Sequence, residues 1–194
     1  MATVASLAAA GLVAIFGFHR QKPVEKELAG VEVGGPTVSI ERAHRGLLKH
    51  HLEGATLWEA CNQKTLEMFT FAEEPIACGY VASVEFSRAA SAGDCRDPTG
   101  ALPDLHLEAV TPRGIGLDAT EADIRKAYGK PWKTEQGRGE TYLHYRSKLK
   151  KHPSGATALR LVFTLRNGKT TSVSLDLDGP MFEKSPKSMA PCRN

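Results

Sequence analysis

Two stretches of the chain place apolar residues on one face of a helix, and each is followed by runs that alternate as strands do. In the first stretch the apolar face consists of Ile40, Ala43, Leu47, Leu48 and Leu52. Pro36 suits a first helical turn, Thr37 can cap it and Gly54 can end it. The pattern therefore predicts a helix in residues 37–54. Three strands are predicted after it, at residues 55–61, 65–71 and 78–87.

The same order of elements is predicted in the second half of the chain. Thr120 and Asp123 have the spacing of a capping box at a helix start, and Gly129 with Pro131 can end that helix. Three strands again follow, at residues 140–146, 156–165 and 170–177.

The last two predicted strands constrain their own pairing, because both carry apolar side chains at odd positions. A two-residue turn at Asn167-Gly168 would set odd positions opposite even ones and expose one apolar set. A three-residue loop, 166–168, pairs Leu161 with Val173 and keeps both sets on one face. We therefore predict the longer loop, with its glycine in the left-handed position of a bulge.

Local similarities occur in the same order in the two halves. Residues 69–71 (Phe-Thr-Phe) resemble 163–165 (Phe-Thr-Leu), and 83–86 resemble 172–175. We predict an α+β fold of two tandem modules, each a short helical segment packed on a small antiparallel sheet, preceded by a hydrophobic transmembrane helix. The predicted boundaries are an anchor at 1–19, a tether at 20–36, a first module at 37–95, a linker at 96–113, a second module at 114–180 and a tail at 181–194.

The predicted anchor is an apolar run near the N-terminus. From Ala2 to Phe18 there are 17 residues without a charge, enough for a helix of about 25 Å against a bilayer core of about 30 Å. A secretory signal peptide is an alternative, but no Lys or Arg precedes the run and no A-x-A cleavage site follows it. A buried soluble helix is a further alternative.

The cysteines indicate the compartment. Four of them, without a CxxC pair or metal-ligand spacing, are typical of two disulfides in an oxidising environment. In a simple meander Cys61 and Cys78 lie at opposite ends of the sheet while Cys95 lies near Cys61, so we predict Cys61–Cys95 and Cys78–Cys192. Basic residues after the apolar run favour the cytoplasmic side instead. We give the cysteines more weight and predict a membrane-anchored protein whose soluble part is extracytoplasmic, on the periplasmic side, with the cytoplasmic alternative left open.

The second half resembles a known family. The residues that carry the resemblance are 114–131 (Gly-Ile-Gly-Leu-Asp through Tyr-Gly-Lys-Pro), Tyr142 to Tyr145, Leu161 to Phe163, 167–169 (Asn-Gly-Lys) and Ser172-Val173. Over residues 114–178, with a weaker copy at 37–87, the chain resembles small extracytoplasmic modules related to β-lactamase-inhibitor-like domains and the SmpA/OmlA lipoproteins of outer-membrane barrel assembly. The resemblance implies a helical segment on an antiparallel sheet that acts through protein contacts. No lipobox cysteine precedes Cys61 and no inhibitory residue can be matched, so lipid anchoring and inhibitor activity are not implied.

Charge is unevenly distributed along the chain. Residues 1–110 carry 9 Lys/Arg and 14 Asp/Glu, whereas residues 111–194 carry 16 and 8. Either the second half docks an acidic surface, or the two halves are solvated faces of opposite sign. The residues predicted to contact a partner are Arg146, Lys148, Lys150, Lys151 and Trp132, most of them in a predicted loop at 146–155. A solvated hairpin tip, and a tryptophan in the core, are the alternatives.

Catalytic, cofactor and metal signatures are absent from the sequence. On the predicted helix His50 and His51 would point to different sides, and Gly114-x-Gly116 lacks the third glycine of a dinucleotide site. The basic loop lacks the interleaved aromatic residues of nucleic-acid binding. We predict a non-catalytic, membrane-tethered extracytoplasmic accessory or scaffold subunit that acts through protein–protein contacts in a membrane-bound assembly, without cofactor, metal or nucleic acid. An exported inhibitor or binder of another enzyme is the alternative, and an enzyme with an unrecognised site is a third class.

Overall fold

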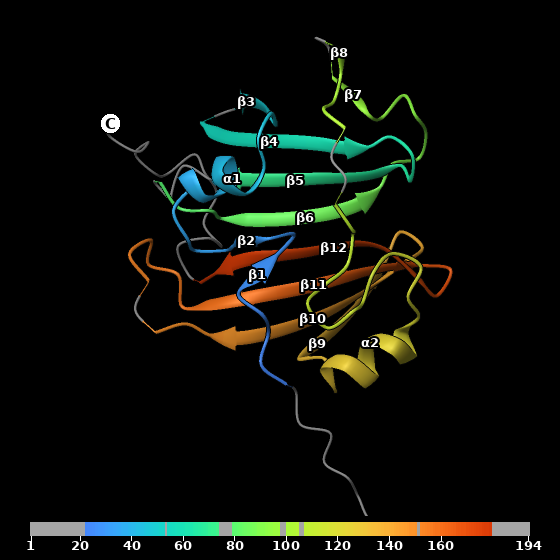
Figure 1. Ribbon diagram of the computed structural model, residues 1–194. Coiled ribbons are helices and arrows are strands. Elements are labelled where there is room, and N and C mark those ends of the chain that lie inside the picture. Colours follow the sequence, from blue (N-terminus) through green and yellow to red (C-terminus); the bar gives the residue numbers. More distant parts are fainter. Residues whose placement is uncertain are drawn as a thin grey trace, which may run out of the picture.

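An antiparallel sheet organises the part of the chain that the structure, a computed structural model, describes: residues 22–52, 54–73, 79–97, 100–104, 107–150 and 152–179. Within these residues eight strands form one sheet, in the order β3-β4-β5-β6-β12-β11-β10-β9 (Figure 1). The strands are β3 (Leu48–Leu52), β4 (Ala55–Asn62), β5 (Glu67–Glu73), β6 (Ser83–Arg88), β9 (Lys133–Gly137), β10 (Glu140–Lys148), β11 (Ala158–Arg166) and β12 (Lys169–Asp178). The other described elements are α1 (Val38–Ala43), α2 (Glu121–Tyr128), a ribbon of β1 (Glu27–Leu28) with β2 (Val31–Glu32), and a ribbon of β7 (Arg96–Asp97) with β8 (Gly100–Ala101).

The predicted α+β fold of two tandem modules, each with its own small sheet, is wrong. β6, the last sheet strand of the first half, pairs with β12, the last strand of the second half, so both halves share one sheet. Alternation shows which side chains face the core, but it does not show which strand lies alongside. Pairing β6 with β12 removes two strand edges that would otherwise present unpaired N–H and C=O groups. Within the described residues the chain is therefore mostly antiparallel β structure.

The first predicted helix is much shorter than expected. α1 ends at Ala43, and the residues from Leu48 onward form the edge strand β3. Between them Gly46 adopts a φ of 80°, a left-handed conformation that interrupts a helix. Leucines at 47, 48 and 52 fit a helical face as well as a short strand, so their spacing alone could not distinguish the two.

An approximate two-fold axis relates the two halves of the sheet. Val84 lies opposite Leu175 and Phe86 lies opposite Val173 at the β6–β12 junction. A two-fold axis between the strands would exchange Val84 with Val173 and Phe86 with Leu175. This exchange turns each of the two pairs into the other, as such an axis requires. The same axis relates β5 to β11, β4 to β10, and the two five-residue edge strands β3 and β9. The local similarity of residues 83–86 to 172–175 therefore falls on equivalent positions.

The other local similarity is out of register with this axis. Phe69 lies opposite Phe86, and the equivalent of Phe86 is Leu175, which lies opposite Leu161. Phe69 is thus equivalent to Leu161, two positions before Phe163, to which the sequence similarity had aligned it. Tandem duplication stays a prediction, since one of its two sequence matches does not follow the symmetry of the sheet.

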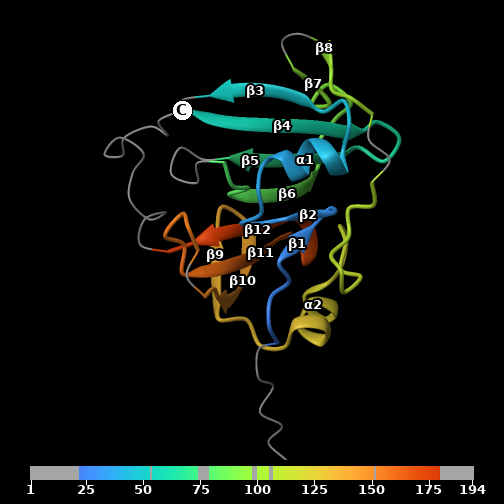
Figure 2. The same cartoon turned by 60° about the vertical axis from the view of Figure 1, so that its left-hand side comes forward.

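Both helices and the β1–β2 ribbon cover the same face of the sheet (Figures 1 and 2). Ile40 from α1 and Tyr128 from α2 are fully buried in one apolar cluster with the inward side chains of the strands. The largest of those inward side chains are Tyr145, Phe69, Phe71, Phe86 and Phe163. Burial of these aromatic residues on one side of the sheet supplies its main hydrophobic stabilisation.

The segment before α1 is part of this core. Residues 22–33 fall in the span predicted as a tether, yet they contribute the buried side chains of Val24, Leu28, Val31 and Val33. We call residues 22–33 the N-terminal strap, because they run across the helix-covered face. Within the strap β1 pairs with β2, and the Val33 N–H donates to the Lys26 carbonyl just beyond them.

The loop of the β11–β12 hairpin differs from the prediction, whereas the apolar side chains of both strands share one face as predicted. Arg166 pairs with Lys169, which makes Asn167-Gly168 a two-residue turn with both φ values positive, 52° and 75°. The register then shifts after Thr164, so Leu161 lies opposite Leu175 and the apolar residues of both strands share the core face. The three-residue loop is therefore wrong, and a bulge inside the strand restores the parity that the apolar pattern demands.

The predicted Cys61–Cys95 disulfide is confirmed, with the two Cα atoms 5.5 Å apart. It joins β4 to the segment before β7, and both cysteines are buried in a small second cluster with Ala89 and Leu102. Cys78 and Cys192, the other predicted pair, lie outside the described residues.

In the described part of the chain, no helix is long and apolar enough to span a bilayer. This contradicts the predicted localisation, which depended on a transmembrane helix. Residues 2–18, from which that helix was predicted, lie outside the described residues.

Candidate functional site

The face of the sheet opposite the helices is polar. In the two central strands the half-buried side chains on this face are Ser83, Glu85, Ser87, Ser172, Ser174 and Asp176, alternating with buried apolar residues. Burial, followed by the nearby charge of Asp176, raises the pKa of Glu85 above its usual value. This polar face continues across β11 and β10 to the edge strand β9.

Basic side chains gather on that face over the outer three strands. Arg146 lies directly opposite Arg160 of β11, and Lys148 is two residues further along β10 on the same side. Lys133 of β9 lies opposite His144, which precedes Arg146 by two residues. We call Lys133, Arg146, Lys148 and Arg160 the basic strip.

Trp132 stands at the edge of the basic strip. Its side chain is 55% exposed, one of three large exposed apolar side chains in the described part of the chain. Its backbone N–H donates to the carbonyl of His144 over 2.8 Å, which extends the β9–β10 pairing by one residue. The Arg146 guanidinium lies 5.3 Å from the centre of the indole ring, in cation–π range.

Carboxylates on β12 hold the two arginines in place. Arg146 Nε lies 2.8 Å from Asp178 Oδ2, and the Asp178 side chain is only 9% exposed. Arg160 lies 3.6 Å from Asp176. With Asp178 on its flank and the indole of Trp132 beneath it, the Arg146 guanidinium has a defined orientation before any ligand arrives.

The loop that follows β10 is anchored at both ends. Leu149 packs against the core, and its N–H donates to the carbonyl of Thr157 over 2.9 Å. His152 Nε2 lies 2.8 Å from the Gly34 carbonyl, and its ring meets the Tyr80 ring edge-on at 5.1 Å. Because the Gly34 carbonyl only accepts, Nε2 must be the protonated ring nitrogen.

The structure brings together some of the predicted contact residues. Arg146, Lys148 and Trp132 share the edge of the polar face, and Lys150 is exposed in the adjoining loop. Lys151 lies outside the described residues. Trp58, the other tryptophan of the chain, is 3% exposed and belongs to the core.

Sequence reasoning missed His144, which lies inside the basic strip. The residue is 9% exposed, and its Nε2 is 2.9 Å from Glu135 Oε2, although the two groups are not aligned for a hydrogen bond. The approximate two-fold axis of the sheet makes Glu59 equivalent to His144 and His50 equivalent to Glu135. His50 and Glu59 form a pair of the same kind, also with 2.9 Å between nitrogen and oxygen. Single histidines on strands give no spacing signal, so no pattern could have selected His144.

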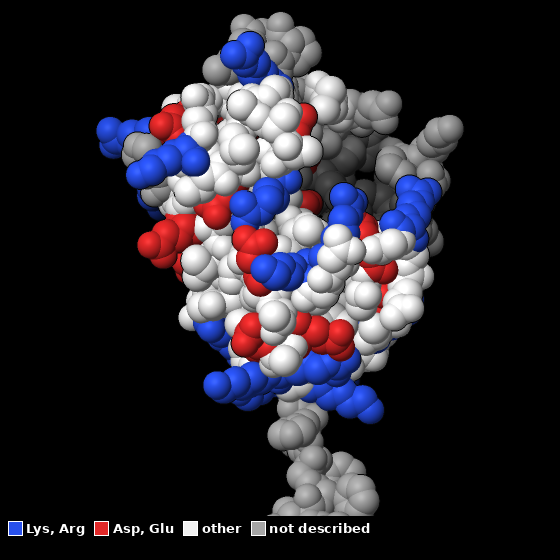
Figure 3. Space-filling view, turned by 90° about the vertical axis from the view of Figure 1, so that its right-hand side faces the viewer, with Lys and Arg blue, Asp and Glu red and all other residues white. Residues whose placement is uncertain are grey.

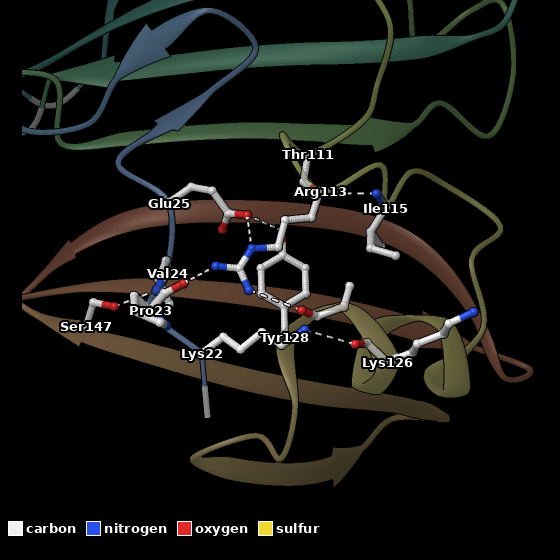
Figure 4. A network of polar contacts seen from close by, with 11 residues as sticks. Lys22, Pro23, Val24, Glu25, Thr111, Arg113, Ile115, Lys126, Tyr128 and Ser147 are labelled. Atoms are coloured by element: carbon white, nitrogen blue, oxygen red, sulfur yellow. Dashed lines mark hydrogen bonds and ion pairs between the residues drawn. The ribbon is translucent and has the colours of Figure 1, made fainter. Parts of the chain in front are cut away.

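A second polar cluster was also missed, and it fastens the N-terminal strap (Figure 4). Arg113 Nε lies 2.8 Å from Glu25 Oε1, which also accepts a hydrogen bond of 2.9 Å from the Tyr128 hydroxyl. The guanidinium further donates to the carbonyls of Ala127, over 3.1 Å, and Pro23, over 2.5 Å, and lies 4.7 Å from the centre of the Tyr128 ring. Burial, the largest cause, raises the pKa of Tyr128 far above its usual value. This cluster joins segments about 90 residues apart, which no local pattern reveals.

The difference in charge between the two halves of the sequence does not divide the surface in the same way. On the side shown in Figure 3, acidic and basic side chains lie next to one another. Ion pairs within and between the halves, such as Arg88 with Asp118, place opposite charges side by side. Among the described residues, no group of three or more His, Cys, Asp or Glu side chains could hold a metal ion.

Comparison with protein-family models, with curated proteins and with solved structures finds no match to this chain. The resemblance of residues 114–178 to β-lactamase-inhibitor-like and SmpA/OmlA modules therefore stays a prediction. The site must be judged on its geometry.

Proposed function

We propose that the protein is a non-catalytic binding protein that recognises an acidic segment of a partner protein at the basic strip and Trp132. The observation that carries this proposal is the exposed indole of Trp132 beneath the guanidinium of Arg146. Tryptophan and arginine are, with tyrosine, the residue types enriched among the residues that dominate the binding energy of protein interfaces. A guanidinium fork matches a carboxylate in shape and charge.

The arrangement is suited to binding because little of it must be ordered when a partner arrives. Arg146 is held by Asp178 and by the indole, and the adjoining loop is fixed through Leu149 and His152. Immobilising a flexible side chain costs about 0.5–1.5 kcal/mol on association, and a prearranged site avoids part of that cost. Lys148 and Lys150 are exposed and add positive charge that steers an acidic partner.

The experiment is affinity capture followed by calorimetry with the purified captured protein. We expect Trp132→Ala to weaken binding by about 30-fold, since such anchors are worth about 2 kcal/mol or more. Lys148→Glu with Lys150→Glu should weaken it as well, and rising salt should do the same to the wild type. Lys64→Glu, an exposed lysine in the β4–β5 turn, is the matched control and should change nothing.

Three outcomes decide the proposal. Binding that depends on Trp132 and the two lysines supports it. Wild-type affinity in both strip variants refutes it, as does capture of anionic lipid vesicles in place of any protein. All variants should keep the wild-type melting temperature, because exposed substitutions of this kind change stability by about 0.5 kcal/mol at most.

A further inference from the structure

His144 is a buried histidine that lies among the cations of the basic strip. The charged and titratable described groups that face His144 are Lys133 and Glu135 from β9, Arg160 from β11, and Tyr142 and Arg146 from β10 itself. The His144 side chain is 11% exposed, whereas that of Glu135 is 45% exposed. Glu135 also pairs with Lys133, so its charge is shared between two neighbours.

These surroundings favour the neutral imidazole in the free protein. Burial, as the largest cause, lowers the pKa of His144, and the charges of Arg160 and Lys133 act in the same direction. Glu135 opposes this shift without cancelling it. A bound carboxylate beside the strip would change the balance, because it offsets the repulsion between the imidazolium and the neighbouring cations.

We propose that the basic strip binds its acidic partner together with a proton taken up by His144, so that mildly acidic pH strengthens binding. This inference rests on the proposed function. The described carboxylates that pair with cations of the strip are those of Glu135, Asp176 and Asp178. Protonation of His144 adds one positive charge where the partner binds. Proton uptake and anion binding then favour each other reciprocally.

The test uses a hexa-aspartate peptide as probe, because its carboxylates stay ionised across the range. Its affinity for the full chain is measured by fluorescence anisotropy at about pH 7.5, 6.5 and 5.5. We expect affinity to rise about fivefold between the first and the last, the order of effect that one added charge has at a screened surface site. His144→Gln should bind with little change across this range.

His152→Gln is the matched control, since His152 lies in the loop that follows β10 and contacts the Gly34 carbonyl, not a residue of the strip. It should keep the pH dependence. A second measurement needs no variant: in an NMR titration of the wild type, the pKa of His144 should rise when the peptide is bound. This readout holds even if His144→Gln folds poorly.

The outcomes separate this inference from the proposed function. Binding that is weakened by Lys148→Glu but is the same at all three pH values overturns the coupling alone. Loss of the pH dependence in His152→Gln, with its retention in His144→Gln, assigns the effect to the loop and also overturns it. Absence of peptide binding at every pH overturns both proposals.

Discussion

Replacing Arg113 by Met should loosen the attachment of the N-terminal strap to the second half of the sheet. The guanidinium makes an ion pair with Glu25, donates to two backbone carbonyls and covers the Tyr128 ring. Met keeps most of the aliphatic packing and removes the charge. The Glu25 side chain, 13% exposed, would then retain only the Tyr128 hydroxyl as a partner in the cluster.

The expected cost follows from that exposure. Removing one partner of a fully buried ion pair costs about 3–5 kcal/mol, whereas exposed pairs are worth about 0–1 kcal/mol. Arg113 is 27% exposed, so solvent reaches part of the pair and we expect a loss of about 2–3 kcal/mol. For a chain of this size that corresponds to a fall in melting temperature of about 5–10 °C.

The assay is urea unfolding followed by circular dichroism, with limited proteolysis of the strap as a local readout. Arg88→Met is the matched control, because Arg88 forms an exposed ion pair with Asp118, the side chains being 42% and 59% exposed. Glu25→Gln completes a double-mutant cycle, in which the double variant should lose less than the sum of the single losses. If Arg113→Met costs no more than Arg88→Met, and the strap is cut no faster, the cluster does not hold the strap and our reasoning is refuted.

Three further predictions follow from single contacts. Because the pKa of His144 is lowered in the folded state, the unfolded chain binds more protons as pH falls through about 6.5, and the stability of the fold should decrease in this pH range. His144→Gln should flatten that part of a urea stability–pH profile. Replacing Cys61 and Cys95 by Ser should lower the free energy of unfolding by about 2–4 kcal/mol in chemical unfolding. Peptide mapping of the wild type without reduction should find the two residues joined, and wild-type stability in the double variant would count against a structural bond. Thr120→Ala removes the capping box of α2 and should cost about 1 kcal/mol by thermal unfolding, a prediction that an unchanged melting temperature contradicts.

Local chemistry predicted several parts of the fold because it acts between near neighbours. The capping box at Thr120 and the helix stop at Gly129 bound α2 as expected. Alternation in β11 and β12 identified the buried side chains, since a strand with one face on a core must place every second residue inward. The Cys61–Cys95 pair followed from the position of both residues at one end of a meander.

The candidate site was predicted only in part. A run of basic residues and one tryptophan marked Arg146, Lys148 and Trp132, and these do share one edge of the sheet. The neighbours that orient them, Asp178 and Arg160, come from β12 and β11, and no sequence spacing connects them to Trp132.

What the sequence determined by itself was the inward and outward faces of β11 and β12, the ends of α2 and one disulfide. The partners of the strands were decided only in three dimensions. β6 and β12 lie far apart in the chain, and their apolar faces would fit two separate sheets as well as one. A single sheet is more stable because the edge of β6 pairs with the edge of β12. It also lets both helices and the N-terminal strap share one core of aromatic side chains. Which strands pair in this way depends on the whole surface that the fold buries, and no local run of residues carries that information.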